Sequence, residues 1–162
     1  MSGLRQLKTL IKNLKAIEPF ILKEADRFVG RKAKLLTDLN RENLNSGIDS
    51  KGVELNFKKP RITPLTSTLS YTKEYARFKK SKGRQTSFVD LRLLGDFHKS
   101  ITLTRLEQGW FTFTSGVDIF PYLVANYGTE ILGVTEKQLQ EFSTNELKPY
   151  LENKLIGKLL PR

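Results

Sequence analysis

The chain of 162 residues carries 28 Lys and Arg against 17 Asp and Glu, a net charge of +11, and 38% of its residues are hydrophobic. This apolar content suffices for an ordinary core and excludes a wholly disordered chain, and the length fits one domain. The chain has no cysteine and one histidine, which excludes disulfides, thiolate nucleophiles and metal sites with several histidines. No apolar run is long enough to span a membrane.

The first segment predicts an amphipathic helix, because apolar residues recur at three- and four-residue steps with basic residues between them. The apolar positions are Leu4, Leu7, Leu10, Ile11, Leu14 and Ile17. Such a helix can lie on a membrane surface or a nucleic acid, but we favour packing of its leucines on the domain or on a neighbouring subunit. Pro19 predicts a new helix from near Glu18, because proline fits the first turn of a helix and breaks its interior.

Residues 19–45 continue the helical pattern, either as one long helix or as two helices broken near Gly30. The run Asn-Ser-Gly at 45–47 predicts the end of this helix, since glycine commonly follows a helix C-terminus. The polar residues 53–70 hold two prolines, which predicts an extended connection with a short strand at 53–57.

Alternating residues at 101–105 and 110–115 flank a glycine-containing turn and predict a β-hairpin. Thr135 followed by Gln138 matches a capping box, which predicts the start of a helix. Apolar residues then continue at helical spacing to the C-terminal end, although Pro149 disfavours an unbroken helix through its position.

The predicted fold class is therefore α+β: a small antiparallel β-sheet built around a hairpin at about 101–115, packed with long N-terminal and C-terminal helices. We expect a single domain, 1–162, in three regions. These are a helical N-terminal region (1–47), a basic loop and β-sheet region (48–134) and a C-terminal helical region (135–162).

The positive charge is concentrated in the middle of the chain, where residues 51–105 carry a net +9, against +4 for 1–50 and −2 for 106–162. A short helix is expected at 71–80, with its aromatic residues on one side. Glu74 is the only acidic residue between positions 58 and 84. Nine basic residues in this segment are candidate contacts to DNA or to an acidic partner: Lys58, Lys59, Arg61, Lys73, Arg77, Lys79, Lys80, Lys82 and Arg84. In the alternative interpretation these cations are solvated and the aromatic residues Tyr71, Tyr75 and Phe78 anchor the helix on the core.

Motifs for catalysis are scarce, with no phosphate-binding loop and no nucleophile elbow. Asp90, Asp96 and His98 lie close in sequence and could serve a small nuclease as a general base or a single-metal site. We favour instead a helical turn that Asp96 caps after Gly95, with His98 exposed, because such sites need several converging partners. We therefore expect no enzyme, no catalytic residue, no metal and no cofactor.

Several elements follow one another in a recognisable order: Gly52, then Pro64-Leu65, then the Tyr- and Lys-rich run 71–79. Leu-Leu-Gly-Asp-Phe-His-Lys-Ser-Ile follows at 93–101, and then come Tyr127-Gly128 and Ile-Leu-Gly-Val-Thr-Glu at 131–136. Across about residues 50–142, this order and spacing resemble the virion morphogenesis proteins of tailed bacteriophages, namely the tail-completion and neck (head–tail joining) proteins.

The resemblance implies a non-enzymatic structural virion protein that forms a homo-oligomeric ring at the head–tail junction, or completes the tail, with DNA passing through. The implied partners are portal, neck or tail proteins of the same virion, with non-specific contact to phage double-stranded DNA and no membrane. The implied location is the virion, and the host cytoplasm during assembly. The alternative is a small non-specific nucleic-acid-binding protein that uses the basic segment 58–84.

Overall fold

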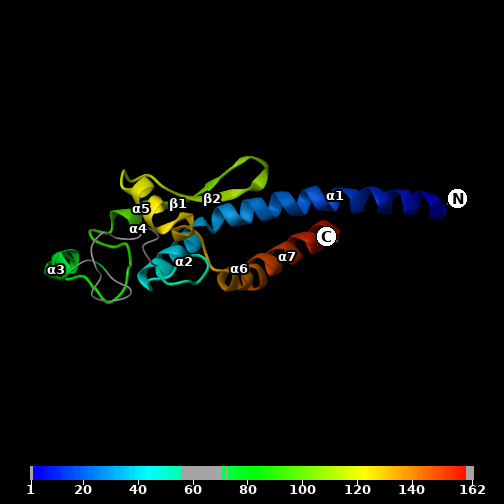
Figure 1. The fold of residues 1–162 in the computed structure, drawn as a ribbon. Coiled ribbons are helices and arrows are strands. Elements are labelled where there is room, and N and C mark those ends of the chain that lie inside the picture. Colours follow the sequence, from blue (N-terminus) through cyan, green and yellow to red (C-terminus); the bar gives the residue numbers. More distant parts are fainter. Residues whose placement is uncertain (1, 56–70, 72, 160–162) are drawn as a thin grey trace.

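The structure is a computed structural model that describes residues 2–55, 71 and 73–159 (Figure 1). The N-terminal part consists of two helices, α1 (Ser2–Arg31) and α2 (Ala33–Asn45). Lys32 separates them, so of the two alternatives for residues 19–45, one long helix or two helices broken near Gly30, the structure shows the second. The predicted strand at 53–57 lies partly outside the described residues, and the part that is described forms one isolated bridge, Ile48 with Glu54.

The predicted new helix near Glu18 is wrong, because α1 runs through Pro19 without a break. Proline removes one helical hydrogen bond, the one that its own N–H would donate to the carbonyl of Lys15. Both Lys15 and Pro19 are exposed, so water can solvate this carbonyl. The helix therefore tolerates proline at a solvent-facing position.

The Asn-Ser-Gly run ends α2 as predicted. Gly47 adopts a left-handed conformation (φ 75°), and its N–H donates to the carbonyl of Leu44 at 3.0 Å. The N–H of Ile48 donates to the carbonyl of Asn43, also at 3.0 Å, which completes a Schellman motif. A side chain at residue 47 would meet the ring of Phe88, so the end of α2 also packs closely on the chain that follows α3.

The middle of the chain contains α3 (Lys73–Ser81), α4 (Asp96–Ser100) and the predicted hairpin. Strand β1 (Ile101–Arg105) pairs antiparallel with β2 (Phe111–Ser115) across the turn η1 (Glu107–Gly109). Two short helices follow, α5 (Phe120–Tyr127) and η2 (Thr129–Ile131). The fold class is α+β with a small hairpin, as the sequence predicts.

The C-terminal part is helical throughout, over α6 (Glu136–Phe142), the π turn η3 (Ser143–Leu147) and α7 (Lys148–Leu159). The capping box at Thr135 is confirmed, since its N–H and Oγ1 both bond to Gln138. The break expected at Pro149 is absent. The wide π turn directly before it, where Lys148 N–H donates to the carbonyl of Ser143, provides room for the proline ring.

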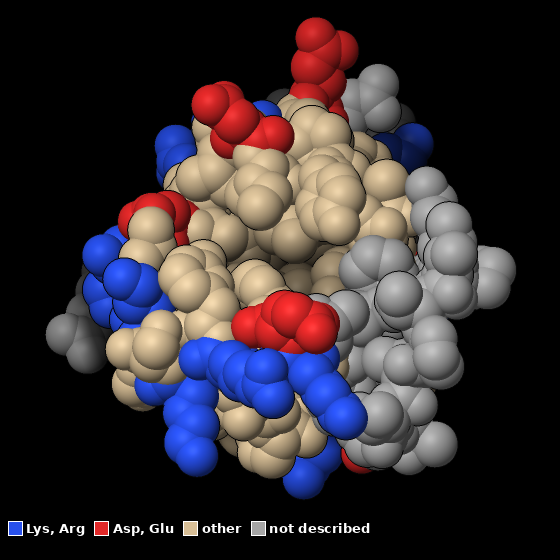
Figure 2. All heavy atoms as spheres, turned by 60° about the vertical axis from the view of Figure 1, so that its left-hand side comes forward, with Lys and Arg blue, Asp and Glu red and all other residues tan. Residues whose placement is uncertain are grey.

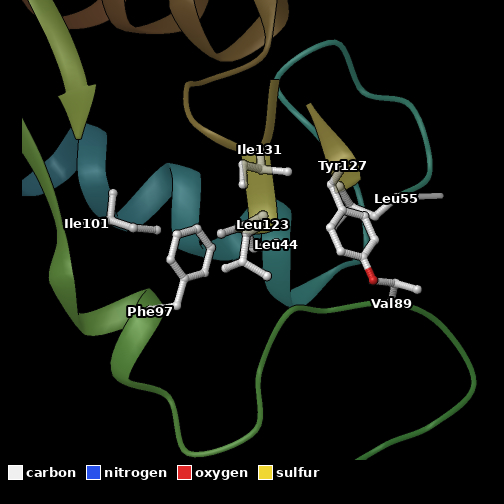
Figure 3. Close-up of a cluster of buried hydrophobic side chains, with 8 residues drawn as sticks. All are labelled: Leu44, Leu55, Val89, Phe97, Ile101, Leu123, Tyr127 and Ile131. Carbon is white, nitrogen blue, oxygen red and sulfur yellow. The ribbon is translucent and has the colours of Figure 1, made fainter. Parts of the chain in front are cut away.

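Two apolar clusters hold these elements together. The first gathers side chains from α2, α4, β1, α5 and η2 (Figure 3): Leu44, Leu55, Val89, Phe97, Ile101, Leu123, Tyr127 and Ile131. The second joins α1, α2 and α6 through Phe28, Leu36 and Phe142, and the ring of Tyr150 stacks on Phe28 with 4.5 Å between centroids. Phe113 of β2 packs on both clusters, so the hairpin connects them.

Helix α1 extends beyond the rest of the described chain. Figure 1 shows α1 and α7 side by side, with the hairpin on one side of α1 and α7 on the other. Near its end, α7 places Lys158 Nζ 4.0 Å from the ring centroid of Phe20, so the earlier turns of α1 run on past α7. Among the described residues, no helix combines the length and hydrophobicity that crossing a membrane requires.

We predict that Gly47→Ala lowers the free energy of unfolding by about 2 kcal/mol, because the left-handed backbone disfavours a Cβ atom and Phe88 blocks the space. Urea denaturation followed by circular dichroism measures this loss. Gly30→Ala is the matched control, since it lies in α1 with nothing near its Cβ position. This variant should gain about 0.5–1 kcal/mol. Equal effects of the two substitutions would contradict the packing described for Gly47.

Candidate functional site

The predicted basic segment is only partly a surface feature. Lys73, Arg77, Lys80 and Lys82 are exposed on α3 and directly after it, and Figure 2 shows Lys and Arg gathered on this face of the molecule. Arg84 is half-buried, and its Nε donates to the carbonyl of Leu93 at 2.9 Å. Lys58, Lys59 and Arg61 lie outside the described residues.

Lys79 is not a surface contact, which corrects its assignment as a candidate for DNA or acidic-partner binding. Its side chain is 0% exposed, and its Nζ lies 2.5 Å from Asp90 Oδ1 and 2.7 Å from the hydroxyl of Tyr71. The ammonium also lies 4.1 Å from the ring centroid of Tyr71. A buried lysine needs a charged partner and further hydrogen bonds, and this lysine has both.

Tyr71 and Asp90 complete this buried cluster. The hydroxyl of Tyr71 donates to Asp90 Oδ1 at 2.9 Å and accepts from the N–H of Asp90 at 3.0 Å. Burial raises the pKa of Tyr71. Burial alone would also raise the pKa of Asp90, but hydrogen bonds from Lys79 and from the N–H of Arg92 outweigh it and lower this pKa. The carboxylate is therefore held ionised against the ammonium.

The suggested trio of Asp90, Asp96 and His98 does not converge. His98 is buried rather than exposed, and its Nε2–H donates to the backbone carbonyl of Asp90 at 2.8 Å. Burial lowers the pKa of His98, which favours the neutral ring. Asp96 is exposed at the start of α4, where Gly95 is the N-cap residue and no side chain makes a capping bond. These groups therefore form no general-base site.

An apolar cavity of about 540 Å³ lies between α3 and α5. Figure 2 shows it as a hollow lined mainly by uncharged residues, above the cations of α3. Tyr71 in the cavity wall belongs to the buried cluster with Lys79 and Asp90, whereas Tyr75 and Phe78 are exposed. Of these three aromatic residues, Tyr71 therefore fits best the interpretation that they anchor the helix on the core. The lining consists of Tyr71, Tyr75, Leu91, Leu93, Leu94, Gly95, Asp96, Phe97, Ile119, Tyr122, Leu123 and Tyr127.

A second pocket, of about 440 Å³, lies on the other side of Leu94 and Gly95, which line both cavities. Its remaining lining is mainly cationic: Arg41, Asn45, Arg84, Arg92, His98 and Lys99. Of the four cations in this lining, only Arg84 is among the contacts predicted from the sequence. The other cations come from α2 and from either side of Gly95, and no local pattern relates them.

Among the described residues, no three His, Asp or Glu side chains are placed to hold a metal ion. Comparisons of the chain with family models, with curated proteins and with solved structures found no match. A function for this chain is therefore inferred from the two cavities, the exposed surfaces and the order of elements in the sequence.

We predict that Lys79→Met destabilises the fold by about 3–5 kcal/mol at pH 7, because it leaves the Asp90 carboxylate buried without its counter-ion. The folded-state pKa of Asp90 is lowered, so its charge stabilises the wild type above about pH 4 and this contribution is lost as the pH falls through the folded pKa. In Lys79→Met, acid neutralises the unpaired carboxylate. The difference between the two proteins should therefore shrink on acidification.

Urea denaturation of both proteins between neutral and acidic pH checks this prediction. Lys80→Met is the control, because Lys80 is the exposed neighbour on the same helix and its loss should cost less than about 0.5 kcal/mol. A destabilisation of Lys79→Met that is independent of pH would show that the charge of Asp90 does not cause it.

Proposed function

We propose that this chain is a structural subunit of a tailed-phage virion that forms a closed ring at the head–tail junction, or completes the tail, with DNA passing through. Residues 50–142 resemble such proteins in the order of their elements. The hairpin and the helix after Thr135 follow in this order in the folded chain. The observation that carries the ring proposal is the presence of exposed apolar side chains on two sides of α1, at the hairpin turn and on the C-terminal helices.

The first apolar area is the turn of the hairpin. Leu106 and Trp110 flank η1, and Trp110 is 70% exposed. A tryptophan in this position contributes nothing to the folded core of its own chain, whereas exposed tryptophans are frequent anchors of protein interfaces. The hairpin is itself fixed on α1, because Arg105 pairs with Asp26 through Nη2–Oδ2 at 2.6 Å. The turn therefore presents the exposed side chains of Leu106 and Trp110 beside α1.

Exposed apolar side chains also occur on the C-terminal helices, at Leu139 of α6 and at Ile156 of α7. Figure 1 places these helices on the side of α1 away from the hairpin. A ring requires a heterologous interface, in which one surface of a subunit meets a different surface of the next. Exposed apolar side chains on two sides of one subunit, at the hairpin turn and on the C-terminal helices, are compatible with this requirement.

The N-terminal end of α1 offers a further surface for neighbours. This part of the helix runs past α7, and its sequence repeats leucine at helical spacing. An amphipathic helix gains most of its stability by packing its apolar face rather than from intrinsic propensity. In the proposed ring, this part of α1 contacts an adjacent subunit, and the basic face around α3 is available to the phosphates of passing DNA.

We predict that the purified protein forms closed rings, which native mass spectrometry and electron microscopy can detect, and that Trp110→Asp shifts them to monomers. A charge at the hairpin turn would have to be desolvated at the interface, whereas it leaves the core of the subunit intact. Val53→Asp is the matched control, because Val53 is also an exposed apolar residue but lies neither on the hairpin turn nor on the C-terminal helices. It should leave the rings unchanged.

A wild-type protein that is strictly monomeric and absent from purified virions would contradict the proposal. Rings that survive Trp110→Asp unchanged would contradict the role of the hairpin turn.

The exposed cations of α3 favour one alternative, a small protein that binds nucleic acid without sequence preference. For such a protein we predict that Arg77→Gln/Lys80→Gln weakens binding to every DNA duplex alike. The slope of log K against log salt concentration should become shallower by about 0.9 for each DNA phosphate that the variant no longer neutralises. Filter binding at several salt concentrations measures this slope. Lys137→Gln/Lys148→Gln is the control of equal charge on the C-terminal helices, and an equal effect of both pairs would contradict a role for α3.

A further inference from the structure

The pocket beside Gly95 brings four cations into one concave site. Arg41 comes from α2, Arg84 from the loop after α3, Arg92 from the segment before Gly95 and Lys99 from α4. Within the described part of the chain, no carboxylate lines this pocket. We propose that it binds a phosphate group.

The four cations differ in whether a carboxylate neutralises them. Arg41 is neutralised by Asp38, with 2.6 Å between Nη1 and Oδ1. Among the described residues, no Asp or Glu forms an ion pair with Arg84, Arg92 or Lys99. Like charges in one concavity repel one another, and an anion that binds between them relieves this repulsion. The pocket therefore has an excess positive charge that a ligand can compensate.

Hydrogen bonds to backbone carbonyls hold two of the cations in place. Arg41 donates through Nε to the carbonyl of His98 at 2.7 Å and through Nη2 to that of Ile101 at 3.0 Å, so it fixes α2 against the junction of α4 and β1. Arg84 donates through Nε to the carbonyl of Leu93, and among the described residues no bond occupies either of its terminal amino groups, which can donate to a ligand. Preorganised donors of this kind lose little freedom when they bind.

Gly95 aligns the other two cations. Its left-handed backbone (φ 94°) turns the chain sharply, so that Arg92 and Lys99 approach one point from both sides. A Cβ atom built on Gly95 would lie 4.0 Å from both Arg92 Nε and Lys99 Cε. Arg92 also reaches toward Asn45 of α2, with 3.4 Å between Nη1 and Oδ1. The cations thus converge although they come from distant parts of the sequence.

This donor set suits a tetrahedral oxyanion. Arginine offers paired donors in a planar fork that matches two phosphate oxygens, and lysine adds a compact charge. The volume of about 440 Å³ falls in the range of ligand pockets and exceeds what one ion fills, so the phosphate can belong to a DNA backbone or to a small molecule. Phosphate binding at this pocket does not require ring assembly, because a single chain contains every donor.

The test uses the full chain and two probes, inorganic phosphate at constant ionic strength and a short duplex DNA. Amide NMR of the wild type should show phosphate-dependent shifts centred on Gly95, Arg92 and Lys99. Arg92→Gln/Lys99→Gln should lose at least about tenfold in phosphate affinity, whereas Arg77→Gln/Lys80→Gln, with the same change in net charge on exposed residues outside the pocket, should keep it. Amide dispersion confirms that both variants fold.

The DNA arm identifies the source of the phosphate. If Arg92→Gln/Lys99→Gln loses more DNA affinity than Arg77→Gln/Lys80→Gln, the ligand is the DNA backbone. If the two variants lose DNA affinity equally, the ligand is a soluble phosphate compound. The proposal is overturned if phosphate shifts no amide near Gly95, or if both variants lose phosphate affinity equally. Each result can be read on monomers or rings, so failure here is distinguishable from failure of the ring proposal.

Discussion

The ion pair between Lys79 and Asp90 is the constraint on which the basic region depends. It is fully enclosed, and it ties α3 to the segment that leads into α4. Tyr71 bonds to both partners, so the start of α3 is held by the same cluster. A helix with so many cations has little apolar surface of its own for docking. Because an unpaired buried charge is costly, the docked position of α3 is the one in which this pair forms.

Docking of α3 separates the cations of the basic region into groups with different tasks. Lys79 becomes part of the core, and its neighbours on the helix stay in solvent. Arg84 turns back to the carbonyl of Leu93 and joins Arg92 and Lys99 around the pocket beside Gly95. The excess charge of residues 51–105 is therefore neither uniformly solvated nor uniformly available. It supplies one core group, one exposed face and one preorganised pocket.

The same packing explains how the chain exposes apolar side chains on two sides of α1. Phe113 contributes to both apolar clusters, so the hairpin is fixed between the α2–α5 core and the layer formed by α1 and α6. The exposed hairpin turn and the exposed residues of α6 and α7 consequently keep fixed directions on different sides of α1 (Figure 1). Fixed directions are what a closed ring requires, because the angle between the two contact surfaces sets the rotation from one subunit to the next.

By itself, the sequence determined the features whose partners lie within a few residues: the Schellman end of α2, the capping box at Thr135 and the hairpin with its turn. Tertiary structure decided the rest. Pro149 is tolerated because a π turn precedes it, and Lys79 is a core group because Asp90 lies opposite. The cationic pocket also depends on the fold, since Arg41 bonds to a carbonyl 57 residues away. Local patterns report propensity and charge, whereas burial and convergence depend on which distant segments pack together.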